Sequence, residues 1–226
     1  MLVSHQYKFI FFKTMKVAGT SVEAVMDKYC LPPDGKHRVQ MRRRESITEH
    51  GISTVRGYLH PGIKWADHLG VGLAKKYLDD IDPDIFKTYT KFSIVRNPWD
   101  KTVSYYHWVH PDLAMSFEEF VTDGCNIPID RFVYCINDEM TCDVHIRYEH
   151  LLDDLKALYN KLGIPDGDKL KDIMPTYLRS IRIAAGRRPL KHYSTYYTDQ
   201  SMIDKISKVY DKEIEWFGYE FENKKG

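Results

Sequence analysis

The stretch that decides the fold is KFIFFKTMKVAGTSVEAVMDKY, residues 8–29. It opens with the apolar, aromatic-rich segment Lys8–Phe12, which is typical of a buried strand. A glycine-containing loop follows. Apolar residues then recur with the spacing of one helix face, at Val22, Val25, Met26 and Tyr29. The stretch therefore predicts a strand, a short loop and a helix, in that order.

The same order of elements recurs further along the chain. Apolar or alternating patterns predict two more strands, at Phe92–Val95 and Val144–Tyr148. Signals for helices follow these strands or lie nearer the carboxyl end of the chain. They are Asn97-Pro98, the capping box Ser116–Glu119, a leucine stripe over residues 151–162 closed by Gly163, and Asp199 as a cap. Strands that alternate with helices predict an α/β fold with a central parallel sheet flanked by helices. Residues 36–67 are expected to be irregular and are basic, and a weak helix is expected after His68. No linker interrupts the pattern, so we expect one domain over residues 1–226.

Composition narrows the function classes. The chain has 33 Lys and Arg against 32 Asp and Glu, a net charge of +1, which argues against a strongly basic nucleic-acid binder. Four cysteines without a CxxC pair favour reduced thiols over a disulfide scaffold or a zinc site. No apolar run reaches the roughly 18 residues of a membrane span. From these patterns we expect a soluble, cytoplasmic protein without a bound metal.

The loop after the first strand is a candidate anion site. Gly19 would let the backbone approach a phosphate closely, and the amides near Ala18, Gly19, Thr20 and Ser21 lie at a predicted helix amino terminus, where an anion is favoured. Lys16 adds a positive charge. The alternative is a plain strand-to-helix turn capped by Thr or Ser. The loop is not a Walker A motif, because its lysine precedes the glycine.

A second candidate anion site follows the strand at residues 92–95. Arg96 leaves the end of that strand with a guanidinium suited to phosphate, and Ser104 lies two turns into the following helix. The alternatives are a structural ion pair between Arg96 and Asp100 and an ordinary helix-face hydroxyl at Ser104.

Taken together, the two segments resemble the sulfotransferases that use 3′-phosphoadenosine 5′-phosphosulfate (PAPS). KTMKVAGTS resembles their 5′-phosphosulfate loop, and FSIVRNPWDKTVSYY resembles their 3′-phosphate segment. The spacing of 80 positions from Lys16 to Arg96 fits as well, and so do VHIRYEHLLDDLKALYNKLGI and the FGYEF tail. The resemblance is faint only over residues 31–67. It is closest to the carbohydrate-type branch, similar to the heparan 2-O-sulfotransferases, and suggests a compact microbial or viral relative with a P-loop-like sulfotransferase fold.

The resemblance implies PAPS as donor, adenosine 3′,5′-bisphosphate as product, and no required metal. It assigns Lys16 and residues 18–21 to the 5′-phosphosulfate and Arg96 with Ser104 to the 3′-phosphate. Met15 replaces the usual proline, and Lys13 adds a second charge that competes for the phosphate. Arg187 and Arg188, with Lys191, are secondary donor ligands in a basic carboxyl-terminal segment.

The resemblance also implies a histidine general base for the acceptor, which is expected to be a sugar hydroxyl of a carbohydrate or glycoconjugate. His68 fits that place best, and His60 is the alternative. The basic run Arg42–Arg44, with Lys36 and Arg38, is either a guide for an anionic acceptor or a solvated loop. Oligomeric state is not indicated.

Two other functions stay open on the residues alone. A small-molecule kinase or nucleotide phosphotransferase would use similar loops but would need magnesium, and the missing Walker lysine counts against it. A noncatalytic nucleotide- or polyanion-binding module would tolerate the loss of Lys16 and of the histidines.

Overall fold

The computed structural model describes residues 1–35, 45–54, 64–123, 127–174 and 191–224. It divides into two compact units, each assembled from two stretches of chain. The first holds Met1–Val95 and Asp130–Gly186, and the second holds Arg96–Ile129 and Arg187–Gly226. Because each unit is discontinuous in sequence, no single linker marks the boundary. The expectation of one domain over residues 1–226 stays a prediction.

The first unit is built on a six-stranded sheet of order β3-β4-β1-β2-β5-β8. The bounds are Leu2–Ser4 (β1), Phe9–Phe12 (β2), Ser46–Thr48 (β3), Gly51–Ser53 (β4), Thr90–Val95 (β5) and Val144–Arg147 (β8). The parallel expectation is confirmed for β2, β5 and β8, with Phe11 opposite Phe92 and Ile94 opposite Ile146. The other pairings are antiparallel. The sheet is therefore mixed, because the first strand, β1, folds back on β2.

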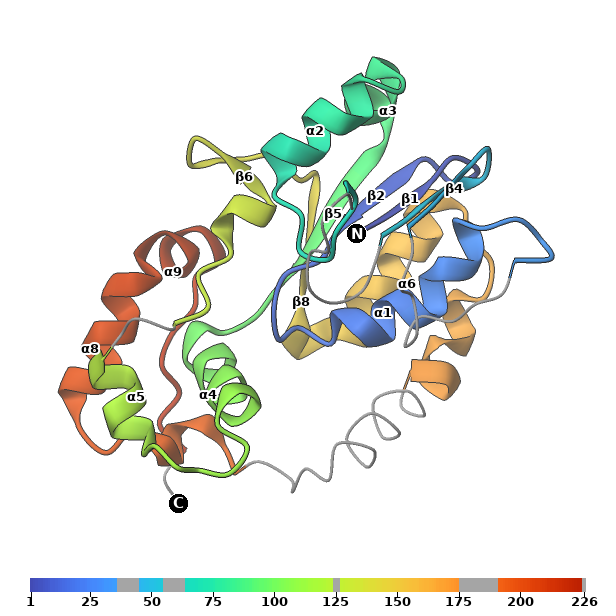
Figure 1. The fold of residues 1–226 in the computed structure, drawn as a ribbon. Coiled ribbons are helices and arrows are strands. Elements are labelled where there is room, and N and C mark those ends of the chain that lie inside the picture. The colour runs from blue at the N-terminus through green and yellow to red at the C-terminus, as the bar shows by residue number, and fades with distance from the viewer. Residues whose placement is uncertain (36–44, 55–63, 124–126, 175–190, 225–226) are drawn as a thin grey trace. The chain divides into compact units, whose positions relative to one another are not determined.

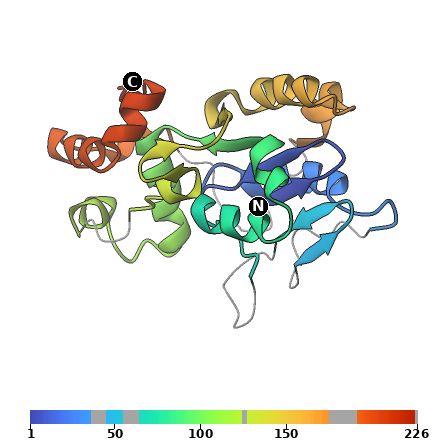
Figure 2. The same cartoon turned by 90° about the horizontal axis from the view of Figure 1, so that it is seen from above.

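Part of the stretch expected to be irregular forms the β3–β4 hairpin. Each of these strands has three residues, too few to produce a readable alternation of apolar and polar positions. In Figure 2, α6 in gold and the cyan β3–β4 hairpin lie on opposite sides of the blue β1–β2 pair. A second, two-stranded sheet pairs β6 (Cys135–Ile136) with β7 (Glu139–Met140).

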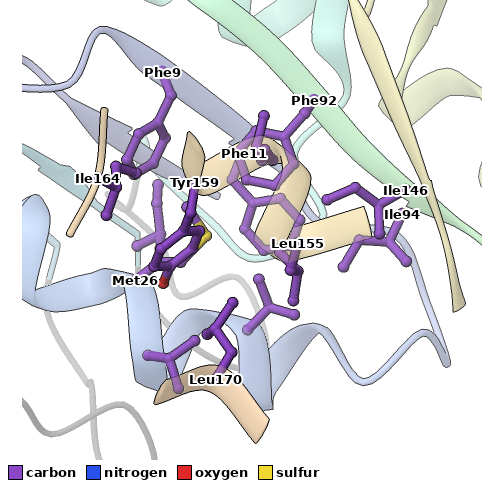
Figure 3. Close-up of a cluster of buried hydrophobic side chains, with 14 of the residues drawn as sticks. Phe9, Phe11, Met26, Phe92, Ile94, Ile146, Leu155, Tyr159, Ile164 and Leu170 are labelled. Atoms are coloured by element: carbon purple, nitrogen blue, oxygen red, sulfur yellow. The ribbon is translucent and has the colours of Figure 1, made fainter. Parts of the chain in front are cut away.

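The core of the first unit lies between one face of the sheet and the helices α1 (Gly19–Met26) and α6 (Leu151–Leu162) (Figure 1). Alternate residues of the parallel strands point into it, and Phe11 stacks on Phe92 with ring centroids 4.9 Å apart. Leu155 and Tyr159 of α6 meet Met26 of α1 in the same cluster (Figure 3). The remaining helices of this unit are α2 (Val71–Asp79) and α3 (Pro83–Thr88).

Local signals fix where several helices begin and end. The α-helical part of α1 ends at Met26, and a 3-10 turn over Asp27–Tyr29 follows it directly. The predicted apolar face is therefore kept through Tyr29. The α6 helix closes at Gly163, whose φ of 67° is the left-handed conformation that glycine adopts without strain.

The second unit is helical among its described residues. It contains α4 (Pro98–Val109), α5 (Phe117–Asp123), α8 (Gln200–Val209) and α9 (Asp211–Phe217). Each of the first three starts at the predicted cap: Asn97, the Ser116–Glu119 capping box, and Asp199. Aromatic rings fill its interior, including Trp99, Tyr106, Phe117, Phe120 and Tyr197. Among the described residues, no helix combines the length and apolar character that crossing a membrane requires.

We expect Leu155→Ala to lower the free energy of unfolding by about 2–5 kcal/mol, because it leaves a cavity in a core position that is fully buried. Leu73→Ala is the matched control. Leu73 lies on α2 and is 46% exposed, so its truncation should change stability by less than about 1 kcal/mol. Urea unfolding followed by circular dichroism measures both. Equal losses in the two variants would contradict this placement of the core.

Candidate functional site

The loop between β2 and α1 is held in an uncommon backbone conformation. Lys16 and Ala18 both have positive φ values, 60° and 58°. Non-glycine residues seldom adopt this region, and each instance costs roughly 1–3 kcal/mol, so such positions gather at ligand-binding sites. Two such positions therefore lie within three residues of each other in this loop.

The strained loop leads directly into a helix amino terminus. Ala18 occupies the cap position of α1, and its methyl group cannot accept a hydrogen bond from the first-turn amides. Thr20 is half-buried, whereas Ser21 is buried, with only 1% of the residue exposed. The alternative of a turn capped by Thr or Ser therefore does not hold, and the geometry fits an anion at this helix end.

Two buried anchors hold the loop in place. The Thr14 hydroxyl donates a hydrogen bond to the carbonyl oxygen of Ile94 on β5. The Met15 amide donates to the Asp130 carboxylate, with 2.5 Å between nitrogen and oxygen, and Asp130 is 1% exposed. Asp130 was not among the sequence candidates, because it lies 115 positions from Met15 and only the fold brings it there.

Lys13 lies in a buried cluster of charges. Its ammonium is 2.8 Å from Glu23 Oε2 of α1 and 2.8 Å from Asp67 Oδ2. The amino group of Met1 is 3.5 Å from Glu23 Oε1. The Lys13 side chain is only 5% exposed, and two carboxylates already neutralise it. This placement makes Lys13 a weaker candidate ligand for a bound phosphate.

His68 lies against the same cluster. Its Nδ1 is 2.9 Å from the backbone carbonyl oxygen of Lys13. A carbonyl oxygen only accepts, so Nδ1 carries the hydrogen and the neutral ring keeps its lone pair at Nε2. Burial lowers the pKa of His68 below its ordinary value of 6.5, although the Asp67 carboxylate raises it in part. The imidazole is therefore neutral near pH 7, and with 34% of the side chain exposed its surroundings are reachable by a solute.

Asp67 and Glu23 were also not among the candidates from the sequence. Burial alone would raise the pKa of Asp67, but Lys13, the amino group of Met1 and His68 together hold that pKa at about 2. The sequence carried one signal for Glu23, which stands beside the apolar stripe of α1 and is fully buried. Because Glu23 is buried, its carboxylate requires a partner of opposite charge, which it finds in Lys13.

In the second unit, Arg96 lies just before α4 and Ser104 lies on it. Arg96 places Nε and Nη2 each 2.8 Å from Asp100 Oδ2, which is the structural ion pair anticipated as the alternative. This pair orients the guanidinium and uses two of its five N–H donors. Ser104 is half-buried. A role for Arg96 in phosphate binding stays a prediction.

Several sequence candidates lie outside the described residues. These are His60, Arg187, Arg188 and the basic run with Lys36, Arg38 and Arg42–Arg44. Lys191 is described and exposed. Within the described ranges, no group of three or more His, Cys, Asp or Glu side chains is arranged to hold a metal ion.

Comparisons with known proteins place the chain in a family. The model described as "Sulfotransferase family" matches residues 1–220. The chain is also similar to an uncharacterized protein of Archaeoglobus fulgidus, with 32% identity over 91 residues, 36% of this chain and 74% of that protein. No solved structure matches the chain.

We expect the stabilising effect of Asp67 to fade in acid. Its pKa is lowered from 3.8 to about 2 on folding, so its contribution is complete above pH 3.8 and is lost as the pH falls through 2. The stability difference between wild type and Asp67→Asn should shrink by about 1 kcal/mol between pH 5 and pH 3. Urea unfolding at both pH values measures this difference. A difference that stays constant would show that Asp67 titrates normally in the folded protein.

Proposed function

This chain belongs to the sulfotransferase family, and we propose that it transfers a sulfuryl group from PAPS to a hydroxyl group of a carbohydrate or glycoconjugate. The observation that carries this proposal is the strained loop at Lys16–Ala18, which opens α1 and has a neutral histidine, His68, bound to the same segment. An anion site and a base of suitable pKa are what transfer of a charged group to a hydroxyl requires.

The donor side uses the loop and the first turn of α1. Lys16 and the amides and hydroxyls of residues 18–21 hold the 5′-phosphosulfate, with Thr20 the more accessible hydroxyl. Arg96, oriented by Asp100, and Ser104 hold the 3′-phosphate. Arg187 and Arg188 are secondary candidates for the same donor. Lys13 remains a weaker one, since its ammonium is paired with Glu23 and Asp67.

His68 acts as the general base. Its Nε2 accepts the proton of the acceptor hydroxyl while that oxygen forms a bond to sulfur and the bond from sulfur to the bridging phosphate oxygen breaks. Lys16 stabilises the negative charge that grows on this leaving oxygen. Bound PAPS supplies the activated sulfuryl group, and this chain's residues position it and the acceptor. His60 is the alternative base.

The first test concerns donor choice. Adenosine 3′,5′-bisphosphate should bind at least ~10-fold tighter than AMP, equivalent to about 1.4 kcal/mol, because only the bisphosphate offers a partner to Arg96 and Ser104. Arg96→Ala should weaken binding of the bisphosphate and leave AMP binding unchanged, so AMP is the internal control. Isothermal titration calorimetry measures all four affinities.

Equal affinity of the wild type for both nucleotides would overturn the donor assignment. Tight ATP binding together with a strict magnesium requirement would instead favour the phosphotransferase alternative.

The second test separates binding from chemistry. Lys16→Ala and His68→Ala should each lower kcat by roughly 10²-fold or more, because both side chains act mainly on the transition state. Donor affinity should fall modestly in Lys16→Ala and hardly at all in His68→Ala. Turnover of labelled PAPS against a panel of glycans, glycolipids and small alcohols gives both rate and acceptor class.

Lys87→Ala and His150→Ala are the matched controls, since both residues are exposed and lie on other elements of the first unit. Near-normal turnover in His68→Ala with an inactive His60→Ala would make His60 the base. Normal turnover in both histidine variants would exclude the histidine mechanism.

A further inference from the structure

The buried cluster around Lys13 connects α1 to His68 through one residue. The Lys13 ammonium donates to Glu23 of α1 and to both oxygens of Asp67, at 2.8 and 3.1 Å for the latter. The backbone carbonyl of the same lysine accepts the Nδ1 hydrogen of His68. Lys13 thus touches the helix with its side chain and the imidazole with its main chain.

The stem of Lys13 is also pressed against the start of α1. A Cβ atom placed on Gly19 would lie 2.8 Å from Lys13 Cγ and 3.1 Å from its Cε. Contacts under 3.0 Å are essentially never seen for real Cβ atoms, so the lysine stem packs there because position 19 has no side chain. Glu23 follows Gly19 by one helical turn and therefore lies on the same face of α1. The amino terminus of α1 and the position of Lys13 are consequently set together.

We propose that Lys13 is a positioning residue, clamped between Glu23 and Asp67, that fixes His68 with Nε2 as the proton-accepting atom and couples that atom to the anion-binding end of α1. The proposal rests on the proposed function, in which His68 is the base. It gives a role to the two buried carboxylates of the cluster, Glu23 and Asp67, which have none in the proposed donor site.

The charged groups that face His68 act in opposite directions. Asp67 is the residue before His68 in the chain. Its Oδ2 is 3.9 Å from His68 Nε2, and its negative charge favours the protonated ring. The Lys13 ammonium after β2 and the amino group of Met1 before β1 disfavour it, as burial does. Glu23 of α1 contacts the cluster through Lys13 and Met1. Removing Asp67 or Lys13 should therefore move the proton affinity of His68 in opposite senses.

The experiment follows His68 by NMR in protein labelled with nitrogen-15 at histidine, with His68→Gln assigning the signal. Asp67→Asn should lower the pKa of His68 by about one pH unit, and Lys13→Met should raise it by a similar amount. Lys13→Met leaves two carboxylates facing each other, so this variant can fail to fold. The double variant K13M/E23Q avoids this because it keeps the net charge of the cluster, and it should show the same rise in the pKa of His68. Glu213→Gln removes a buried carboxylate of the second unit and should leave the titration unchanged.

Long-range nitrogen–proton spectra read the tautomer directly, and wild type should carry its hydrogen on Nδ1. The acid limb of kcat/KM should move with the NMR titration in each variant. A general loosening of the structure would instead move the pKa of His68 toward 6.5 in Asp67→Asn and K13M/E23Q alike. Shifts of the same sign, no shifts, or a hydrogen on Nε2 in wild type would overturn the proposal.

The two proposals fail in different ways. If wild type shows no sulfuryl transfer while the opposite shifts appear, the cluster controls the histidine as inferred and the proposed function is wrong. If wild type transfers sulfuryl groups and His68→Ala is inactive while the shifts are absent, the proposed function stands and the role of Lys13 is wrong.

Discussion

A lysine ammonium in the interior of the first unit is the constraint on which the rest of this site depends. An unpaired charge in such surroundings costs several kcal/mol, so it persists only with close partners of opposite charge. Lys13 finds them in Glu23 and Asp67, which come from a helix and from a segment 54 residues further along the chain. This requirement draws the strand end, the helix and the segment around residue 67 to one point. The position of His68 follows from it.

The strained loop depends on the same convergence. Positive φ values at Lys16 and Ala18 are costly, and they are kept because the flanking residues leave the backbone little choice. Thr14 and Met15 are tied to Ile94 and Asp130 on one side, and the lysine stem occupies the space beside Gly19 on the other. The result is a helix amino terminus without a side-chain cap, placed at the end of a parallel strand. That is where sheets of this kind bind anionic ligands.

Much of the fold could be predicted because its signals are local. The apolar segment of β2, the caps at Asn97 and Asp199 and the leucine stripe of α6 each act within one element, and the structure confirms them. The antiparallel strands β1, β3 and β4 were not predicted. Three-residue strands show no usable periodicity, and they are stabilised by pairing with neighbours that are distant in sequence.

The features of the candidate site likewise divide into those with local sequence signals and those set by tertiary contacts. The sequence by itself singled out as candidates the loop with Lys16 and Gly19, the arginine after β5 and the histidine at position 68. Each follows from residue type and spacing or from the family resemblance, and their roles stay predictions. Only the tertiary structure decided that Lys13 is paired with buried carboxylates, that Asp130 holds the Met15 amide, and that His68 keeps its lone pair at Nε2. These facts are set by burial and by contacts between residues 10 to 115 positions apart. A sequence pattern records which groups are present, whereas their charge balance and proton positions depend on which groups the fold brings within a few ångströms of one another.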